Sequence, residues 1–180
     1  MRVCLDPGHG GIDSGAVGKT GVKESKQALI LAKLIAMELA KDFGIELTRY
    51  SDERVFLPER AEIANSAEAD IFLSIHFNSA VDKETGLPDP QAHGTETYHH
   101  PQGNERLAKT IHPLLLNGTQ LRDRGIKTAN FSVLRNTKMP AALIEICFLS
   151  NPQEEKLAGD CLFLVRVAKE ISAGIRLYFK

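Results

Sequence analysis

The stretch DIFLSIH at residues 70–76 is the part of the sequence that decides the fold. It is a short, nearly continuous apolar run, which is typical of a central strand in a parallel sheet that is covered on both faces. The run ends on His76, and a polar ring at the end of a buried strand needs a partner. We therefore expect an open α/β sheet with His76 at its carboxyl edge, where the reacting groups of such folds gather.

Other short apolar runs alternate with amphipathic stretches along the chain, which is the pattern of an α/β layer fold. The remaining expected strands are residues 2–6, 45–50, 94–99, 131–135 and 141–146. The expected helices cover residues 24–43, a stretch from 58, 104–116, a stretch from 152, and 160–178. Pro113 should kink the third of these helices or end it early. The sequence therefore predicts one three-layer α/β domain over residues 1–180, with a six-stranded, mostly parallel mixed sheet and helices on both faces.

The composition is that of an ordinary soluble domain, with 43% hydrophobic and 25% charged residues and a formal net charge of -1. This charge argues against a nucleic-acid partner bound through its phosphates, and no apolar stretch is long enough to predict a membrane span. The three cysteines, Cys4, Cys147 and Cys161, show no paired spacing, so we expect buried free thiols rather than disulfides.

The N-terminus shows no signal-peptide pattern, because Met1 runs directly into the first expected strand. We therefore expect a protein that is made in the cytoplasm and then released, or a domain that belongs to a longer secreted protein.

Four residues far apart in the sequence are candidates for a catalytic metal site. His9 follows the first strand, Glu24 begins the first helix, His76 ends its strand, and Glu145 lies in the last one. Two neutral imidazoles and one carboxylate, with a fourth position left for water, form a recurring catalytic zinc set. The spacing matches no short zinc motif, so the local context carries the argument. The glycines around His9 allow close backbone approach and positive φ.

Each candidate also has a structural alternative. The glycines around His9 could cradle a phosphate, and Glu24 could offset the dipole at the start of its helix. His76 could be a core histidine that bonds a backbone carbonyl. Glu145 is the hardest to explain structurally, because a carboxylate in an apolar strand is costly unless it is paired or lies near a metal.

The other histidines are not expected to bind metal. His99 and His100 follow a strand and should be exposed, His93 lies in a long loop, and His112 falls on a polar helix face.

Eight segments, in order along nearly the whole chain, resemble the zinc-dependent N-acetylmuramoyl-L-alanine amidases of the amidase-3 family. Any one segment would be weak evidence, but the ordered set is specific. The segments are LDPGHGGIDSGAVG (5–18), GVKES (21–25), PERAEIAN (58–65), ADIFLSIHFNS (69–79), GTETY (94–98), RGIK (124–127), SVLRNTKMPAALIE (132–145) and FLSNPQEEKL (148–157).

The resemblance implies one zinc ion bound by His9, Glu24 and His76, with Glu145 as the catalytic residue. It implies bacterial peptidoglycan as the substrate, cleaved at the amide between the lactyl group of N-acetylmuramic acid and L-alanine. Asn78, two residues after His76, is expected to bind substrate or to support the site. Phage endolysins and bacterial autolysins both fit this description, and a separate wall-binding domain could lie outside this chain.

One position departs from the family pattern, and two other functions stay open. Cys147 stands where the family usually has glycine, and its side chain is expected to narrow the site. The chain could be a zinc-containing wall-binding module without turnover, although the presence of Glu145 favours catalysis. It could also be another peptidoglycan metallohydrolase, such as a peptidase or a deacetylase.

Overall fold

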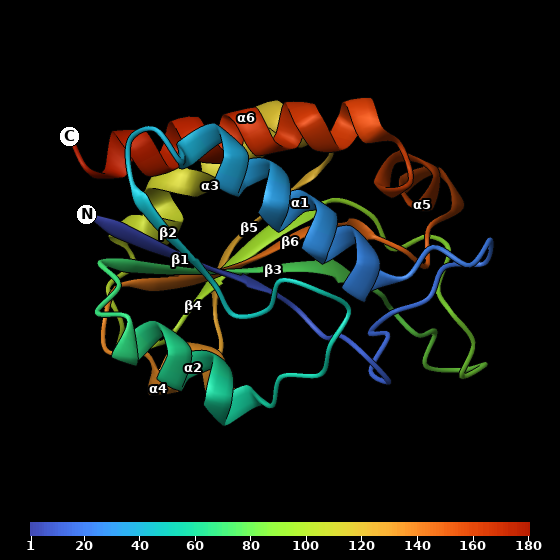
Figure 1. Cartoon of the computed structure of the whole chain (residues 1–180). Helices are drawn as coiled ribbons and strands as arrows, with labels where there is room; N and C mark the ends of the chain where they lie inside the picture. Colours follow the sequence, from blue (N-terminus) through green and yellow to red (C-terminus); the bar gives the residue numbers. More distant parts are fainter.

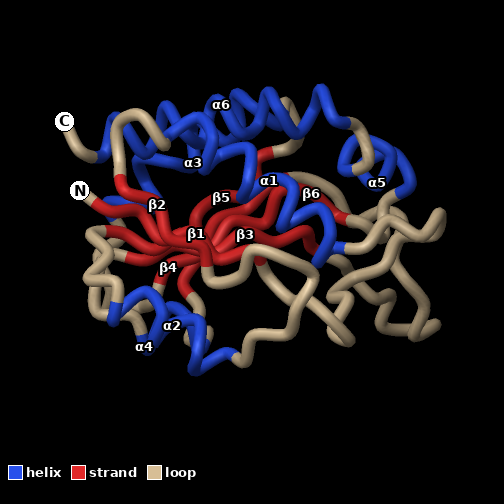
Figure 2. Tube along the Cα trace, viewed as in Figure 1, coloured by secondary structure: helices blue, strands red, loops and turns tan.

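A six-stranded sheet separates two layers of helices, as Figures 1 and 2 show for the computed structural model of residues 1–180. The strands run in the spatial order β2-β1-β3-β6-β4-β5, and every neighbouring pair is parallel except β4 and β6. Their bounds are β1 (Arg2–Pro7), β2 (Gly44–Leu47), β3 (Ile71–Asn78), β4 (Thr95–His99), β5 (Asp123–Thr128) and β6 (Ala141–Phe148).

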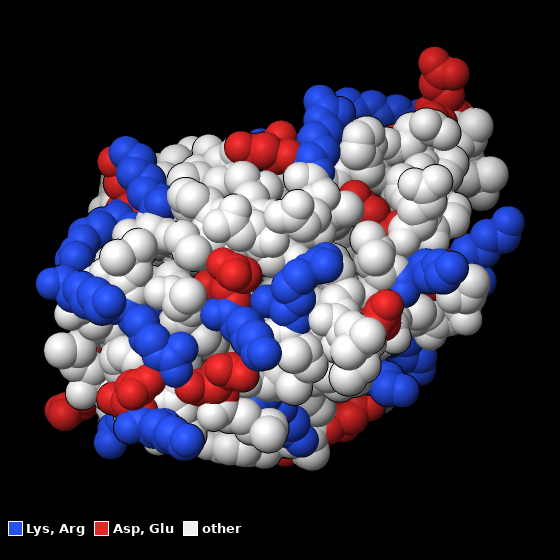
Figure 3. Space-filling view, turned by 90° about the horizontal axis from the view of Figure 1, so that it is seen from above, with Lys and Arg blue, Asp and Glu red and all other residues white.

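The helices divide between the two faces of this sheet (Figure 1). One face is covered by α1 (Glu24–Leu39), α3 (Arg106–Thr119) and α6 (Cys161–Tyr178), and the other by α2 (Leu57–Ser66) and α4 (Ser132–Asn136). The short helix α5 (Pro152–Ala158) follows β6. None of these helices combines the length and the apolar character that crossing a bilayer requires. Seen from above, Lys and Arg side chains alternate with Asp and Glu, with uncharged surface between them (Figure 3).

The core explains why the reacting residues meet at one edge. Strand β3 is buried from Ile71 to Ile75, because it lies between β1 and β6 and beneath helices on both faces. Strands β1, β3 and β6 are mutually parallel, and the pairing places His76 directly beside Glu145. Their carboxyl ends therefore open at the same edge of the sheet, where ligand sites of open α/β folds form.

The predicted class of fold is confirmed, whereas one of the predicted strands is wrong. Residues 131–135 fall at helix α4, and the sixth strand is instead β5. Five residues are too few to distinguish the helical period from the strand period. Strand β5 escaped prediction because it is an edge strand, paired only with β4, in which Ile126 is the sole apolar side chain.

Helix α3 also differs from the prediction, because it continues through Pro113 to Thr119. The proline removes one backbone hydrogen bond, but the apolar side of the helix packs closely on α6. Gly174 of α6 allows this approach, since a Cβ there would lie 3.3 Å from the Ile111 Cα. Burial of this face compensates for the missing bond, as tertiary packing commonly does in helices.

The cysteines and the first helix give two smaller corrections. Cys4 and Cys147 are buried free thiols as expected, but Cys161 is exposed at the start of α6. Helix α1 ends at Leu39, four residues before the predicted end, and Gly44 begins β2.

Candidate active site

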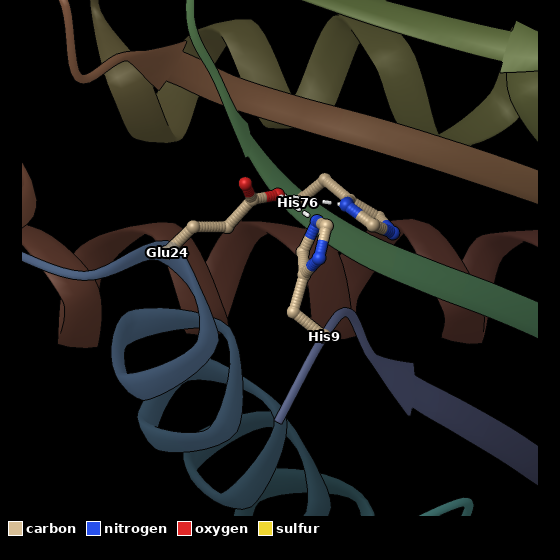
Figure 4. Close-up of side chains that lie close together, drawn as sticks. All are labelled: His9, Glu24 and His76. Atoms are coloured by element: carbon tan, nitrogen blue, oxygen red, sulfur yellow. Dashed lines mark hydrogen bonds and ion pairs between the residues drawn. The ribbon is translucent and has the colours of Figure 1, made fainter. Parts of the chain in front are cut away.

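Three of the four candidate residues converge at the carboxyl edge of the sheet (Figure 4). His9 lies in the loop after β1, Glu24 begins α1, and His76 lies near the end of β3. Glu24 Oε1 is 2.7 Å from His76 Nδ1 and 3.3 Å from His9 Nε2. One ligand atom from each side chain lies within 4.8 Å of the others, so a single cation could contact all three.

Glycines make room for this cluster. A Cβ on Gly8 would lie 2.3 Å from His76 Cε1, and a Cβ on Gly15 would lie 2.5 Å from Glu24 Oε2. His9 itself has a φ of 59°, a left-handed conformation that costs free energy for a residue with a side chain. The backbone around His9 therefore adopts a conformation that brings the side chains together, although an isolated chain would disfavour it.

Two buried arginines hold the loops that carry the cluster. Arg60 donates to the carbonyl oxygen of His9 at 2.7 Å. Arg49 donates from one nitrogen to the carbonyl oxygens of Gly8 at 2.8 Å and Ser25 at 2.6 Å. Because Ser25 follows Glu24, the Arg49 guanidinium ties the loop of one candidate ligand to the helix of another.

Further contacts orient the donor atoms. The Nδ1 atom of His9 lies 3.0 Å from an Asp13 carboxylate oxygen, which leaves Nε2 facing Glu24. The backbone N–H of Ala16 donates to Glu24 Oε2 at 2.8 Å. Burial opposes ionisation of Glu24, but its bonds with His76 and His9 hold the pKa of the carboxyl well below its ordinary range. Such outer contacts are typical of metal ligands.

Glu145 lies in β6 between His76 and Glu96 in the strand register. Its Oε2 is buried and has no hydrogen-bond partner. Burial, together with the charges of Glu24 and Glu96, raises the pKa of Glu145 well above its ordinary value. A carboxyl group whose pKa is raised in this way can accept a proton and return it.

The residues present fit a zinc ion. Two imidazoles and one carboxylate are the ligand types of catalytic zinc sites, which keep one position open. A nearby cation would also stabilise the ionised form of Glu145, whose buried Oε2 has no hydrogen-bond partner.

A cleft of roughly 600 Å³ opens over this site. His9, His76 and Glu145 line it, whereas Glu24 does not and is only 5% exposed. The opposite wall comes from the start of α2 and the start of α4, including Phe56 and Phe131. We call His9, Glu24 and His76 the donor cluster. A molecule bound in the cleft could therefore reach Glu145 and the two histidines of the donor cluster at the same time.

Asn78 lies outside the lining of this cleft. Its Nδ2 donates to Glu96 Oε1 at 2.7 Å, and its Oδ1 accepts from the backbone N–H of Ser79 at 2.8 Å. A contact between Asn78 and substrate stays a prediction, and the structure assigns its side chain to support of Glu96.

Glu96, which the sequence did not single out, lies beside the site. This carboxylate is buried beside Glu145 and accepts hydrogen bonds from Tyr98, Arg124 and Lys127, besides Asn78. The segments GTETY and RGIK contain four of these five residues. The acidic residue of the first segment and the two basic residues of the second were the signal in the sequence for this cluster.

The remaining histidines lie away from the donor cluster. Two of these histidines were expected at the surface but are buried, since His99 is 8% exposed and His112 is 5% exposed. His112 bridges Thr97 Oγ1 and Asp123 Oδ1, each at 2.9 Å, and so connects α3 with β4 and β5.

The expected narrowing of the site by Cys147 is also wrong. Regular alternation would place Cys147 on the same face as Glu145, two residues earlier, but the register of β6 against β3 shifts just after Glu145. Cys147 therefore packs in the larger core rather than in the cleft. Its Sγ lies 3.7 Å from the carbonyl oxygen of Glu154.

Comparison with known proteins defines the class to which this fold and site belong. A family model described as N-acetylmuramoyl-L-alanine amidase, the amidase-3 family, matches residues 3–177. The chain therefore belongs to this amidase family.

Individual relatives agree with this assignment. The chain is 35% identical to the N-acetylmuramoyl-L-alanine amidase LytC of Bacillus subtilis, over 99% of this chain and 35% of LytC. It is 37% identical to an endolysin of Bacillus phage SPP1, over 96% of this chain and 64% of the endolysin. The structure of the catalytic domain of CwlV, an amidase from Bacillus (Paenibacillus) polymyxa var. colistinus, superposes with a TM-score of 0.92. The identity to CwlV is 36%, covering 99% of this chain and 97% of that domain. The chain thus spans about a third of LytC and under two thirds of the endolysin.

Proposed function

We propose that this chain is the catalytic domain of a zinc-dependent amidase that hydrolyses the bond between N-acetylmuramic acid and L-alanine in bacterial peptidoglycan. The observation that carries the proposal is the meeting of His9, His76 and Glu145 in one cleft, with Glu24 behind them. The substrate class is that named by the family to which the chain belongs.

Each of the four residues has a separate role. His9, Glu24 and His76 would bind the zinc ion. The bound ion would supply a Lewis acid that polarises the amide carbonyl and acidifies water. The Glu145 carboxylate accepts a proton as water adds to the carbonyl carbon, and the same proton then goes to the L-alanine nitrogen as the C–N bond breaks. One carboxyl group thus serves as base and then as acid, and it ends each cycle unchanged.

The place of action follows from the same chemistry. Peptidoglycan is the polymer of the bacterial cell wall, so the domain would act at the wall, either as part of a phage endolysin or as part of a bacterial autolysin. The relatives include proteins named as an endolysin and as cell wall amidases. Because the chain spans only part of several relatives, a separate wall-binding domain is part of the proposal.

The test uses two substitutions that separate zinc binding from proton transfer. Glu145→Gln removes the proton acceptor but keeps its volume, so hydrolysis of purified peptidoglycan should fall by about 10²- to 10⁴-fold while one zinc ion per chain is retained. His76→Ala removes a ligand, so both zinc content and hydrolysis should fall. Glu62→Gln, at an exposed position of α2, is the matched control and should behave as the unsubstituted protein.

The measurements are zinc stoichiometry by atomic absorption and mass spectrometry of the released fragments. An amidase frees stem peptides whose L-alanine has a new amino terminus, whereas a peptidase or a deacetylase does not. If Glu145→Gln hydrolyses peptidoglycan at the rate of the wild type, the role of Glu145 is refuted. Products of another bond would refute the assigned reaction.

A further inference from the structure

The cleft extends from the donor cluster to a second wall that the proposed chemistry does not use. This wall is formed by Arg54 and Phe56, which precede α2, by Leu57 in its first turn, and by Phe131 at the start of α4. The three apolar side chains are 53%, 56% and 40% exposed in the order Phe56, Leu57, Phe131. Apolar side chains gathered in a cleft beside a reactive centre mark a place for a ligand.

Arg54 is the only cation of this wall, and it has no carboxylate partner. Its guanidinium carbon lies 4.5 Å from the centre of the Phe56 ring, so the ring holds the side chain in place. By contrast, the Arg60 guanidinium in the same cleft pairs with Asp6 at 2.8 Å. No residue of the protein accepts a hydrogen bond from Arg54, and its planar fork of donors is suited to a carboxylate.

The backbone places Arg54 close to the metal donors. The N–H of Gly11 donates to Asp52 Oδ1 at 2.9 Å, which joins the loop after His9 to the loop before α2. Gly11 has a φ of 61°, and a Cβ there would lie 2.9 Å from the backbone nitrogen of Arg54. The loop of Arg54 is therefore packed directly on the loop of His9.

We propose that Arg54 binds a carboxylate on the stem peptide of the substrate and so sets the preference of the enzyme among peptidoglycans. The inference rests on the proposed function. In the proposed substrate, the carboxyl group of the lactyl ether is consumed in the scissile amide, and the N-acetylated sugars carry no charge. The stem peptide carries the free carboxylates, so it matches an unpaired cation. Wall phosphate polymers are the other source of anions.

The experiment compares one peptidoglycan in three chemical forms. One portion of peptidoglycan keeps its phosphate polymers, and the rest is stripped of them. Half of the stripped material is treated with carbodiimide and ammonium ion, which converts its carboxylates to carboxamides. Initial rates of release of L-alanine amino termini are measured against substrate concentration for the wild type, Arg54→Gln and Arg54→Lys. Lys169→Gln, which removes a positive charge from the exposed side of α6 on the opposite face, is the control.

For the wild type, amidation should raise the apparent KM at least about tenfold and leave kcat nearly unchanged, because a charge-assisted contact made equally in both states affects binding alone. Arg54→Gln should show the high KM on both stripped forms. Arg54→Lys should keep part of the difference, and Lys169→Gln should match the wild type.

An equal effect of amidation on the wild type and Arg54→Gln would overturn the inference while leaving the proposed function intact. A lower KM of the wild type than of Arg54→Gln that appears only on peptidoglycan with its phosphate polymers would assign Arg54 to those polymers and would also overturn the inference. If the wild type releases no L-alanine amino termini from untreated peptidoglycan, the proposed function itself is wrong.

Discussion

Gly8 shows how tightly single residues around the site are constrained. It lies directly before His9, and a Cβ there would come within 2.7 Å of three atoms of the His76 ring. The ring cannot move aside without leaving Glu24, to which its Nδ1 is bonded at 2.7 Å. A single methyl group at this position therefore competes with the geometry of the donor cluster.

We predict that Gly8→Ala weakens zinc binding by about 10- to 100-fold, which is the usual effect of disturbing the support of a metal ligand. The change should be measured by competition with a chelator of known affinity. Gly44→Ala is the control, because the nearest atom to its Cβ is 3.7 Å away, an ordinary contact. Equal zinc affinities for the two variants would contradict this account of Gly8.

For single residues, the sequence predicted which side chains could bind a metal, but not which residues surround and support them. His9, Glu24 and His76 do meet, and Glu145 lies beside them, as their positions at strand and helix ends predicted. The burial of His112 could not be predicted, because it depends on how α3 lies against β4 and β5. Arg49 was equally hidden, since all of its hydrogen bonds go to backbone carbonyls that the sequence does not mark.

Among the elements, α5 has a role beyond packing. Its Glu155 is 1% exposed and accepts from the backbone N–H and the hydroxyl of Thr20, at 2.8 and 2.7 Å. It also accepts from the N–H of Val22 at 3.4 Å. These bonds fix the loop that leads into Glu24, so a helix near the end of the chain holds a segment near its beginning.

Replacing Glu155 should therefore loosen that loop. We predict that Glu155→Ala lowers the free energy of unfolding by about 1–3 kcal/mol, because three hydrogen bonds to a buried carboxylate are lost. Glu155→Gln keeps one acceptor oxygen and should lose less than the alanine variant. Urea unfolding followed by circular dichroism measures both. Identical losses for the two variants would show that packing, rather than hydrogen bonding, is the contribution of this side chain.

The elements that could be predicted are those whose pattern repeats over enough residues. The long helices α1 and α6 and the buried strand β3 were expected in nearly their observed places. The helix α4 and the edge strand β5 were missed for opposite reasons, one being too short and the other too polar to show a period. The cluster around Glu96 was missed with β5, because Arg124 and Lys127 both lie on that strand.

Over the whole molecule, Glu96 connects separate strands by charge. Its carboxylate accepts hydrogen bonds from Asn78 of β3 and from Arg124 and Lys127 of β5. Burial opposes its ionisation, but hydrogen bonds from Lys127, Arg124 and Tyr98 hold the pKa of Glu96 below its ordinary value. The ionised form thus stabilises the folded chain.

This linkage predicts a pH dependence of stability. A group whose pKa is lower in the folded state stabilises the fold above its unfolded pKa, about 4.3 for Glu, and loses that contribution as the pH falls through the folded value. For the metal-free protein, Glu96→Gln should lower the unfolding free energy by about 1–3 kcal/mol at pH 7. The difference from the wild type should shrink steadily below about pH 4.3.

Urea titrations across pH 3 to 8 measure this difference. The exposed Glu62→Gln variant serves as the reference and should follow the wild type throughout. A gap between Glu96→Gln and the wild type that stays constant with pH would show that the Glu96 charge adds nothing to stability.

The position of β6 has a consequence for the growing polypeptide. This strand is the last of the six to be synthesised, yet it inserts between β3 and β4. While a ribosome is still making residues before Ala141, the strands β2, β1 and β3 have no strand that joins them to β4 and β5. A nascent chain at that stage already contains His9, Glu24 and His76 but not Glu145. Under the proposed function, the capacity to cut the wall therefore arises only when the sheet is complete.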